Sequence, residues 1–391
     1  MKLNIMKISG FLLSLKSVIF INFFVRYKKI LNKDLKIIFF YFPVKSYQDN
    51  IIELIDELKK EKNIEVILGY NLGSSDQVKK LDKTFFLNLG YLKYIKKIDI
   101  FLSSYVVYEF PESINKIYIN HDIYDTPMVN PQDEKNLMVT LSKCNYIFLS
   151  SESSIFSFKR KINEFLKNEN ISINTSLINT GYLKLDHVHQ KLKNSEISED
   201  SILLAPTLSS MLTEYNLYDY LDNIIKEILN KSELKLIYRP HPGDLRNIKT
   251  NSYIMSINEK FKGNKNFYLD INTSYLDSYK KSKILITDVS GTAYTYAFSK
   301  LRPVIFFSKN EKELLKGNFN DLFFFKDRTE VGKVVENVKE LNNEINFLIG
   351  NIDLYKKKIG LLRSARIKFF NNSLNQNILQ LKKILNNKIL N

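Results

Sequence analysis

The sequence predicts two doubly wound α/β domains, each built on a parallel sheet that is covered by helices. Short apolar runs alternate with helical patterns along most of the 391 residues, and this alternation is typical of parallel sheets. A chain of this length can bury two hydrophobic cores. A polar, charged stretch over 190–200 separates two alternating series. We therefore expect two Rossmann-like domains facing a cleft, over 31–190 and 200–345. An N-terminal segment over 1–30 precedes them. C-terminal helices are expected over 346–391. In one possible arrangement they return to pack on the first domain.

The first domain begins with a continuous apolar run over 35–42, which is typical of a strand buried on both faces. Apolar residues at helical spacing follow between 49 and 60. Further strands are expected at 64–68, 85–89, 98–102, 116–119, 146–149 and 175–179, with a helix over 153–167.

The second domain repeats this alternation. Strands are expected at 202–205, 234–238, 267–269, 284–287 and 303–307, and helices at 217–230, 276–281 and 293–300. The segments 331–345 and 354–385 have mainly helical patterns.

The net charge of +16 comes from 58 basic residues, of which eight are arginine and fifty are lysine. It has two interpretations: a compositional lysine bias, or attraction to anionic lipid or an anionic polymer. No zinc finger, ribonucleoprotein motif or arginine-rich segment is present, so nucleic acid is not an expected partner. The single cysteine, Cys144, excludes an internal disulfide and favours a reducing, cytoplasmic compartment.

The N-terminus holds an apolar stretch from Gly10 to Val25 that lysines flank and Lys16 interrupts. It is shorter than the ~20 residues that span a bilayer, and no small-residue cleavage site follows it, so a signal peptide is not expected. Two interpretations stay open: a helix at the membrane interface, on the inner face of the cytoplasmic membrane, or a helix packed on the first domain.

Two short motifs follow apolar runs of the second domain, and each places polar groups at the carboxyl end of an expected strand, where ligands of open α/β sheets bind. The first motif runs from Tyr238 to Asp244 and holds Arg239 and His241. A guanidinium can grip phosphate oxygens with two parallel hydrogen bonds, and an imidazole can donate a third. The structural alternative is a strand-end turn with an incidental histidine.

The second motif is Thr287-Asp288-Val289-Ser290-Gly291-Thr292. Small residues allow the backbone to approach a phosphate, while Ser290, Thr292 and the start of the next helix supply donors. Asp288 could orient this loop or bind a ribose or acceptor hydroxyl. An ordinary helix N-cap is the structural alternative. The two loops together predict a site for a nucleotide donor.

His121 ends an expected strand of the first domain and precedes Asp122. It could act as general base on an acceptor hydroxyl, with its basicity tuned by Asp122; a satisfied loop histidine is the alternative. His187 and His189 are expected to be solvated linker histidines, and no metal site is expected. The chain has no P-loop, dinucleotide fingerprint or serine-hydrolase elbow.

The motifs resemble those of the CDP-glycerol glycerophosphotransferases, which build teichoic acids and related capsule polymers. The similar segments are Ile202 to Thr207, Tyr238-Arg-Pro-His-Pro242, Ile286-Thr-Asp-Val-Ser290 and Arg302-Pro-Val-Ile-Phe306. Asn179-Thr-Gly-Tyr-Leu-Lys-Leu-Asp186 is similar to a further segment of that family. The chain differs from the family in having Asp122 after the histidine, Tyr182 after Gly181, and Gly291 after Ser290.

This resemblance implies a GT-B fold, a membrane-associated transferase and chemistry that needs neither cofactor nor metal. It implies His121 as base, and Thr207, Arg239, His241, Asp288, Ser290, Gly291 and Thr292 around the donor. The expected substrates are a nucleotide-activated donor, a cytidine nucleotide first, and a glycan or lipid-linked acceptor. Two alternatives stay open: a glycosyltransferase that uses a CMP-sugar (sialic acid or Kdo) or other nucleotide sugar, and a non-catalytic protein that binds polymer or lipid.

Overall fold

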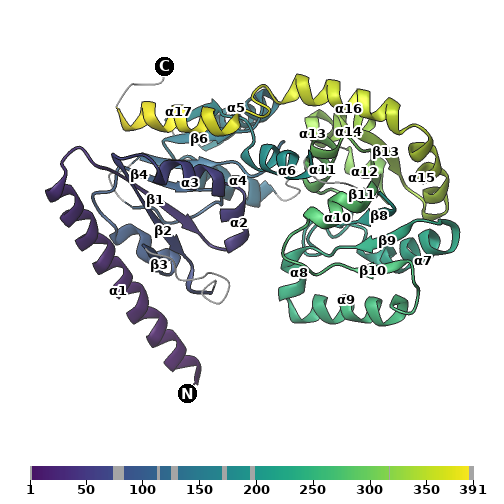
Figure 1. Cartoon of the computed structure of the whole chain (residues 1–391), viewed down its shortest axis with the longest axis horizontal. Coiled ribbons are helices and arrows are strands. Elements are labelled where there is room, and N and C mark those ends of the chain that lie inside the picture. The colour runs from purple at the N-terminus through teal and green to yellow at the C-terminus, as the bar shows by residue number, and fades with distance from the viewer. Residues whose placement is uncertain are drawn as a thin grey trace. The chain divides into compact units, whose positions relative to one another are not determined.

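The computed structural model describes residues 2–73, 83–111, 115–124, 131–169, 174–193, 199–316 and 318–386. The chain divides into two compact units, each of which contains one parallel sheet (Figure 1). Unit 1 comprises Met1–Asp122, Asn130–His187 and Ile367–Asn391, and unit 2 comprises Ile123–Val129 and Val188–Arg366.

The sheet of unit 1 has the strand order β3-β2-β1-β4-β5-β6-β7, and its neighbouring strands pair in parallel. The strands are β1 (Lys36–Phe42), β2 (Ile64–Tyr70), β3 (Thr84–Phe86), β4 (Ile100–Ser103), β5 (Asn115–Ile119), β6 (Tyr146–Leu149) and β7 (Ser176–Asn179). The helices of this unit are α1 (Lys2–Leu31), α2 (Lys45–Asp49), α3 (Ile52–Lys59), η2 (Leu89–Tyr94), α4 (Pro131–Leu141), α5 (Glu152–Glu169) and α17 (Ser373–Leu385). Each strand expected from the sequence is present within a few residues of its expected bounds.

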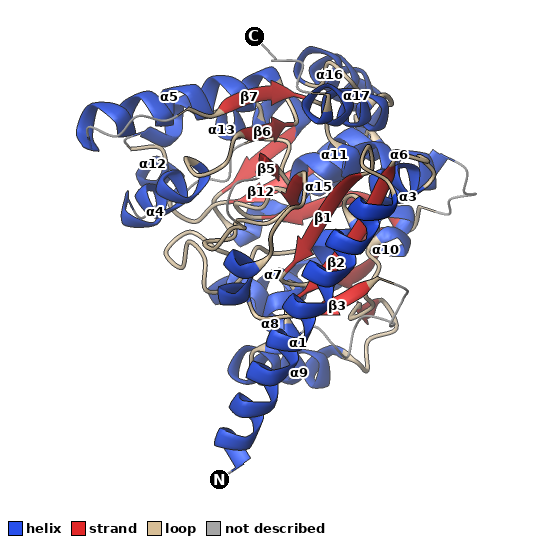
Figure 2. Ribbon diagram, turned by 90° about the vertical axis from the view of Figure 1, so that its left-hand side faces the viewer, coloured by secondary structure: helices blue, strands red, loops and turns tan. Residues whose placement is uncertain are grey.

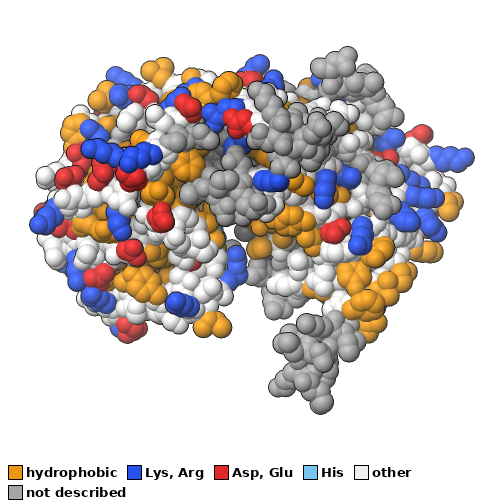
Figure 3. Space-filling model, turned by 180° about the vertical axis from the view of Figure 1, so that it is seen from behind, with side chains coloured by type: hydrophobic (Ala, Val, Ile, Leu, Met, Phe, Trp, Pro, Cys, Tyr) orange, Lys and Arg blue, Asp and Glu red, His pale blue; other side chains and the backbone are white. Residues whose placement is uncertain are grey.

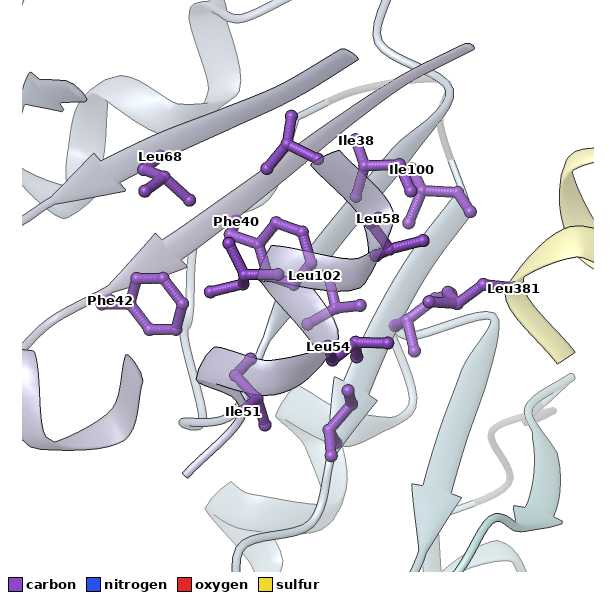
Figure 4. Packing of buried hydrophobic residues seen from close by; sticks show 14 of the residues in the cluster. Ile38, Phe40, Phe42, Ile51, Leu54, Leu58, Leu68, Ile100, Leu102 and Leu381 are labelled. Atoms are coloured by element: carbon purple, nitrogen blue, oxygen red, sulfur yellow. The ribbon is translucent and has the colours of Figure 1, made fainter. Parts of the chain in front are cut away.

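The central strand β1 is buried on both faces because its side chains alternate between two hydrophobic clusters. Ile38, Phe40 and Phe42 pack with α3 and with Leu381 of α17 (Figure 4). Ile37, Phe39 and Tyr41 join the other cluster, which includes residues of α1 and of the 3₁₀ helix η2. A run of apolar residues without polar alternation therefore predicts this strand correctly.

The N-terminal helix α1 packs one stripe on unit 1, against β3 and η2 (Figure 2). Val18, Ile21 and Val25 are buried, and the Ser17 hydroxyl donates a hydrogen bond to the carbonyl of Phe86 at 2.8 Å. The helix continues past Val25 to Leu31, so the expectation of a segment too short to span a bilayer is wrong. By length and composition alone, the 22 residues of Gly10–Leu31 could cross a membrane.

The sheet of unit 2 has the order β10-β9-β8-β11-β12-β13 and is also parallel. Its strands are β8 (Ser201–Leu204), β9 (Lys235–Tyr238), β10 (Phe267–Leu269), β11 (Ser282–Thr287), β12 (Val304–Phe307) and β13 (Gly332–Val335). The helices are η3 (Tyr218–Tyr220), α7 (Leu221–Lys231), α8 (Pro242–Arg246), α9 (Ile248–Phe261), α10 (Leu276–Lys281), α11 (Thr292–Lys300), α12 (Glu311–Leu314), η4 (Asn318–Asp321), α13 (Phe323–Lys326), α14 (Arg328–Val331), η5 (Val338–Glu340), α15 (Leu341–Gly350) and α16 (Ile352–Arg366). The strand order reverses between β8 and β11, which makes this pair the topological switch point.

Strand β13 lies where the sequence favours a helix over 331–345. Gly332 allows the strand to approach β12, because a Cβ atom at this position would lie 1.6 Å from the carbonyl oxygen of Val304. The expected linker over 190–200 also differs, since helix α6 (Leu183–Lys193) continues into it and 194–198 lie outside the described residues. Helices α15 and α16 belong to unit 2, and α17 belongs to unit 1.

Candidate functional site

The switch point of the unit 2 sheet brings together the two strand ends that precede Thr207 and Ser290. Leu204 of β8 pairs with Ile286 of β11, so the segments that follow both strands leave the same edge of the sheet. A ligand of an open α/β sheet binds at this edge, next to the reversal of strand order. The topology thus places the loop after β8 beside the second expected donor loop, after β11. The first expected donor loop follows β9, which β8 separates from β11.

Asp288 connects these two loops from the inside of unit 2. Its side chain is 2% exposed. Its Oδ1 accepts a hydrogen bond from the backbone N–H of Thr207 at 2.9 Å, and its Oδ2 accepts one from Leu217 at 3.1 Å. Burial raises the pKa of the Asp288 carboxyl to about 6, although these N–H groups oppose the shift. Of the two roles expected for Asp288, the structure therefore favours orientation of the loops.

The loop between β8 and η3 has a second internal anchor, Asp244, which the sequence did not single out. Asp244 is buried and accepts hydrogen bonds from the Ser209 backbone N–H at 3.1 Å and from the Tyr218 hydroxyl. The Asn216 amide donates to the carbonyl of Ser209 at 2.9 Å. One sequence signal indicates that Asp244 anchors this loop: Asp244 lies in helix α8, directly after the His-Pro-Gly turn.

His241 is the N-cap of α8 and is exposed. Its Nδ1 accepts a hydrogen bond from the backbone N–H of Gly243 at 3.0 Å, so the neutral ring carries its proton on Nε2. A Cβ atom at residue 243 would lie 3.0 Å from this Nδ1 and 2.7 Å from Leu208 Cδ1. A side chain at residue 243 would therefore displace the Leu208 side chain or the imidazole, which stands after β9 at the carboxyl edge of the sheet.

Arg239 has a different environment from the phosphate fork expected from the sequence. Its side chain is buried, and its Nη1 lies 2.6 Å from the Asp270 carboxylate. Its Nη2 donates to the carbonyls of Asn272 and Thr273 at 2.9 and 3.3 Å. The guanidinium thus holds the segment after β10 in place, and both of its Nη atoms are engaged inside unit 2.

Ser290, Gly291 and Thr292 form the half-buried start of helix α11. The Ser290 hydroxyl oxygen accepts a hydrogen bond from the Thr292 N–H at 3.3 Å, and the Ser290 carbonyl accepts one from Ala293 at 3.1 Å. Gly291 is the N-cap of this helix and no side chain caps it, so the turn at Ser290 differs from the ordinary side-chain N-cap of the structural alternative. It also places two hydroxyl groups beside the positive end of a helix of nine residues.

His121 lies in unit 1, directly after β5. Its Nδ1 is 3.1 Å from the hydroxyl of buried Tyr118, and its ring contacts the edge of Tyr47 with centroids 5.4 Å apart. The distance from its Nε2 to Asp122 Oδ2 is 4.0 Å, which exceeds a hydrogen bond. Tyr118 is therefore the direct partner of the ring, a contact that the sequence analysis missed; Tyr118 precedes His121 by three residues.

The electrostatic environment of His121 favours a neutral imidazole. Burial lowers the pKa of His121, and the Lys184 ammonium lowers it further, while the Asp122 carboxylate acts in the opposite direction. The pKa of Lys184 is itself lowered by burial, against the attraction of Asp122. A neutral histidine can accept a proton, so this environment suits a general base.

The backbone around His121 is fixed by side chains that follow β6 and β7. The Tyr182 hydroxyl donates to the carbonyl of His121, and the Ser150 hydroxyl donates to the carbonyl of Asp122. The amide of Asn120 donates to the same Asp122 carbonyl at 3.3 Å. These contacts hold the histidine-bearing turn against the sheet of unit 1.

His187 and His189 lie on helix α6 rather than in a solvated linker. His187 Nδ1 is 2.7 Å from Glu53 Oε1, and His189 Nδ1 donates to the carbonyl of Ser299 at 3.1 Å. Among the residues that the structure describes, no three His, Cys, Asp or Glu side chains are grouped so that they could hold a metal ion.

The fold recurs along the whole length of solved enzymes, although no family profile matches the chain and no curated protein matches its sequence. The wall teichoic acid polymerase TagF aligns with 97% of this chain and 98% of its own, at 17% identity and a TM-score of 0.62. A TagF variant with one histidine replaced, solved after a soak with CDPG, aligns with 98% of this chain and 99% of its own, at 17% identity and a TM-score of 0.61.

Two further similar structures are an epimerase and an enzyme solved with UDP. A UDP-N-acetylglucosamine 2-epimerase aligns with 92% of this chain and 98% of its own, at 13% identity and a TM-score of 0.56. MnaA of S. aureus, solved with UDP, aligns with 91% of this chain and 98% of its own, at 16% identity and a TM-score of 0.55. Two parallel sheets with helices, together with the likeness to these enzymes, give the chain the GT-B fold.

Proposed function

We propose that this protein is a transferase of surface polymer synthesis that moves glycerophosphate from CDP-glycerol to an acceptor hydroxyl. The observation that carries this proposal is the set of polar groups along the carboxyl edge of the unit 2 sheet. His241 stands there after β9, next to β8, and Ser290 and Thr292 place hydroxyls at the positive end of α11. The full-length likeness to TagF, a wall teichoic acid polymerase, supports the same donor class.

In the proposed reaction, the acceptor hydroxyl oxygen attacks the phosphorus atom that bears glycerol. A new P–O bond forms, the bond to the bridging oxygen breaks, and CMP leaves with that oxygen. His121 Nε2 takes the hydroxyl proton, while its Nδ1 stays hydrogen-bonded to Tyr118. His241, Ser290 and the α11 N-terminus neutralise the charge that grows on the departing phosphate. Positioning and charge neutralisation supply most of the rate enhancement of such a transfer.

The second candidate is a glycosyltransferase with a nucleotide-sugar donor. The likeness to an epimerase of UDP-N-acetylglucosamine, and to an enzyme solved with UDP, favours it over unrelated chemistries. The same phosphate-binding groups serve both donors, because the site contacts the nucleotide phosphate rather than the transferred group. The donor itself separates the two candidates.

The test is thermal stabilisation by CMP, CDP, CDP-glycerol, UDP and GDP, because a ligand that binds the folded state raises its stability by mass action. The proposal expects the largest shift with CDP-glycerol, followed by measurable release of CMP when an acceptor is added. Ser290→Ala and His241→Ala are expected to reduce the shift, while Ser256→Ala, on the exposed surface of α9, leaves it unchanged. A shift with UDP alone would favour the nucleotide-sugar enzyme, and no shift with any nucleotide would favour a non-catalytic binding protein.

We also propose that the protein works in the cytoplasm on the inner face of the cytoplasmic membrane, with a lipid-linked or glycan acceptor. The outer face of α1 supports this location. Among the side chains of α1 that the structure describes, ten large hydrophobic ones are exposed, including Ile19, Phe23 and Ile30. The surface view shows an apolar strip along this helix (Figure 3). Monomeric soluble proteins rarely expose contiguous apolar surfaces of this kind.

The charges of α1 suit an anionic lipid surface. The helix contains six basic residues (Lys2, Lys7, Lys16, Arg26, Lys28 and Lys29) and no acidic residue. Each basic side chain near an anionic bilayer contributes about 1 kcal/mol. A helix with exposed apolar and basic side chains can bind a membrane by burying the apolar side chains at the level of the head groups.

Contacts on the inner stripe of α1 favour an interfacial helix over a spanning one. The Ser14 hydroxyl accepts from the Asn88 N–H at 3.0 Å, and the Asn22 amide donates to the Tyr94 carbonyl at 2.9 Å. A bilayer-spanning orientation would break these contacts and expose the polar groups to lipid, at a cost of several kcal/mol each. An interfacial orientation keeps them.

Vesicle sedimentation tests this location. We expect the full chain to bind vesicles of phosphatidylglycerol mixed with phosphatidylcholine, more weakly at high salt because screening shortens the reach of the charges. Phe23→Glu is expected to reduce the bound fraction. Ile248→Glu, at an 87% exposed isoleucine of α9, is the matched control and leaves it unchanged. Equal binding by both variants would contradict the role of α1.

A further inference from the structure

Tyr124 follows the candidate base by only three residues, yet it is built into unit 2. It is 4% exposed, and its hydroxyl donates a hydrogen bond to Asp327 Oδ2 at 2.6 Å. Its ring meets the ring of Tyr294 edge to face, with centroids 4.5 Å apart. Tyr294 belongs to α11 and lies two residues after Thr292, at the N-terminus of the helix that forms the candidate donor site. Tyr124 therefore packs on the first turn of the donor helix.

The acceptor of the Tyr124 hydrogen bond is itself held rigidly. Arg366 binds both oxygens of the buried Asp327 carboxylate, with Nε–Oδ2 and Nη2–Oδ1 distances of 2.8 Å. The Arg366 guanidinium also stacks over the ring of Phe323, 4.3 Å from its centroid. A bidentate arginine–carboxylate pair fixes geometry better than a single bond does. Asp327 is thus a preset anchor for the Tyr124 hydroxyl.

His121 is fixed at the other end of this short segment by the bonds from Tyr182 and Ser150 to the carbonyls of His121 and Asp122. Three residues of extended chain span at most roughly 11 Å. However the two units are arranged, the Cα atom of His121 cannot lie farther than this from that of Tyr124. The segment is therefore a short covalent tether between the candidate base and the first turn of the donor helix.

We propose that Tyr124 is a positioning residue that keeps His121 in register with the donor bound at α11. The inference rests on the proposed role of His121 as base. Removing the Tyr124 hydroxyl releases the tether from Asp327, so that the base samples positions away from the reacting hydroxyl. A misplacement of about 1 Å reduces turnover by up to ~100-fold, whereas donor binding in unit 2 needs none of these bonds.

The test is steady-state transfer from CDP-glycerol by the full chain and by Tyr124→Phe, Asp327→Asn, their double variant and Tyr296→Phe. Tyr296 is the matched control, because it lies on the same helix and its buried hydroxyl donates to the Ser282 carbonyl at 3.0 Å. We expect Tyr124→Phe to lower kcat roughly 10- to 100-fold, with the KM for the donor changed less than about twofold. We expect the double variant to be no slower than Asp327→Asn, because that change already removes the bond to Tyr124 as well as the charge that pairs with Arg366. A rise in KM at unchanged kcat, or an equal loss in Tyr296→Phe, would overturn the proposal.

Hydrogen–deuterium exchange separates failure of this proposal from failure of the proposed reaction. Exchange is measured in peptides that cover residues 118–124, without substrate. We expect these peptides to exchange faster in Tyr124→Phe than in the wild-type chain. In Tyr296→Phe we expect their exchange rate to stay unchanged. Unchanged exchange in Tyr124→Phe would overturn the tether, whatever reaction the protein catalyses. Faster exchange in a chain that transfers from no nucleotide donor would leave the tether standing and reject the reaction.

Discussion

Asp288 and Thr207 are joined across the switch point of the unit 2 sheet, where Asp288 Oδ1 accepts the backbone N–H of Thr207 at 2.9 Å. The bond fixes the loop after β8 relative to the loop after β11, and these are the two segments that line the candidate donor site. A carboxylate with 2% exposure has lost nearly all its water, and the backbone N–H groups that bind it do not fully compensate the desolvation. The same group that organises the site is therefore a source of pH-dependent stability.

Asp288→Asn is expected to remove this dependence on pH. The folded pKa of about 6 lies above the ordinary value of 3.8. Between these two pH values, the native state therefore keeps the Asp288 proton while the unfolded chain has lost it. Wild-type stability is therefore highest relative to the asparagine variant near pH 4 and falls as pH rises through 6, by about 3 kcal/mol in all. Urea unfolding of both proteins at pH 4 and pH 7 measures the change. An unfolding difference that stays constant between these pH values would contradict it.

His121 is expected to set the acid limb of the pH–rate profile below its ordinary pKa of 6.5, because burial and Lys184 lower the pKa. Lys184→Met removes a positive neighbour and should move the limb to higher pH. Asp122→Asn removes a negative neighbour and should move it to lower pH. The pH dependence of kcat/KM measures both shifts. An NMR titration of the four histidines, assigned with single His→Gln variants, checks them without substrate, and shifts of the same sign in both variants would contradict this electrostatic account.

The sheets could be predicted from the sequence because their strands are continuous apolar runs between turns. Strand β1 is such a run, since both of its faces are covered. Strand β13 could not be predicted, because Gly332 and Lys333 break the apolar run, and the reason for the glycine is a contact with Val304, far away in the chain. Local patterns carry no information about such a contact.

The sequence predicts which sheet edge carries the candidate site, but it does not predict the partners of the residues there. Motifs at strand ends identified the edge of the unit 2 sheet, since parallel strands bring their carboxyl ends together. The motif around Arg239 does not predict that Asp270 binds the guanidinium. Asp270 lies 31 residues later, and the pairing of β9 with β10 brings the two side chains together. The contact of Tyr118 with His121 could not be predicted for another reason. A buried tyrosine in a strand has the same sequence pattern as an ordinary core residue.

Arg239→Met is expected to destabilise unit 2 rather than to weaken nucleotide binding alone. The change leaves Asp270 as a buried carboxylate without its cation, which costs about 3 kcal/mol. The double variant with Asp270→Asn should recover part of this loss. Lys231→Met is the control, because its pair with Glu227 is exposed on the lysine side and contributes less than about 1 kcal/mol. Urea unfolding measures the differences. Full stability of Arg239→Met together with lost nucleotide affinity would instead restore the phosphate-fork interpretation.

Gly243→Ala tests whether the His241 imidazole contributes to nucleotide binding through its position. The new methyl group would lie 3.0 Å from His241 Nδ1 and 2.7 Å from Leu208 Cδ1, so the ring or the Leu208 side chain must move. We expect nucleotide affinity to fall roughly three- to tenfold, the value of one hydrogen bond, with a stability loss of about 1–3 kcal/mol from the overpacked turn. Gly263→Ala, in the same unit, is the matched control, since its Cβ atom would meet no atom within 4 Å. Calorimetric titration with CDP-glycerol compares the two variants, and equal affinities would remove His241 from the donor site.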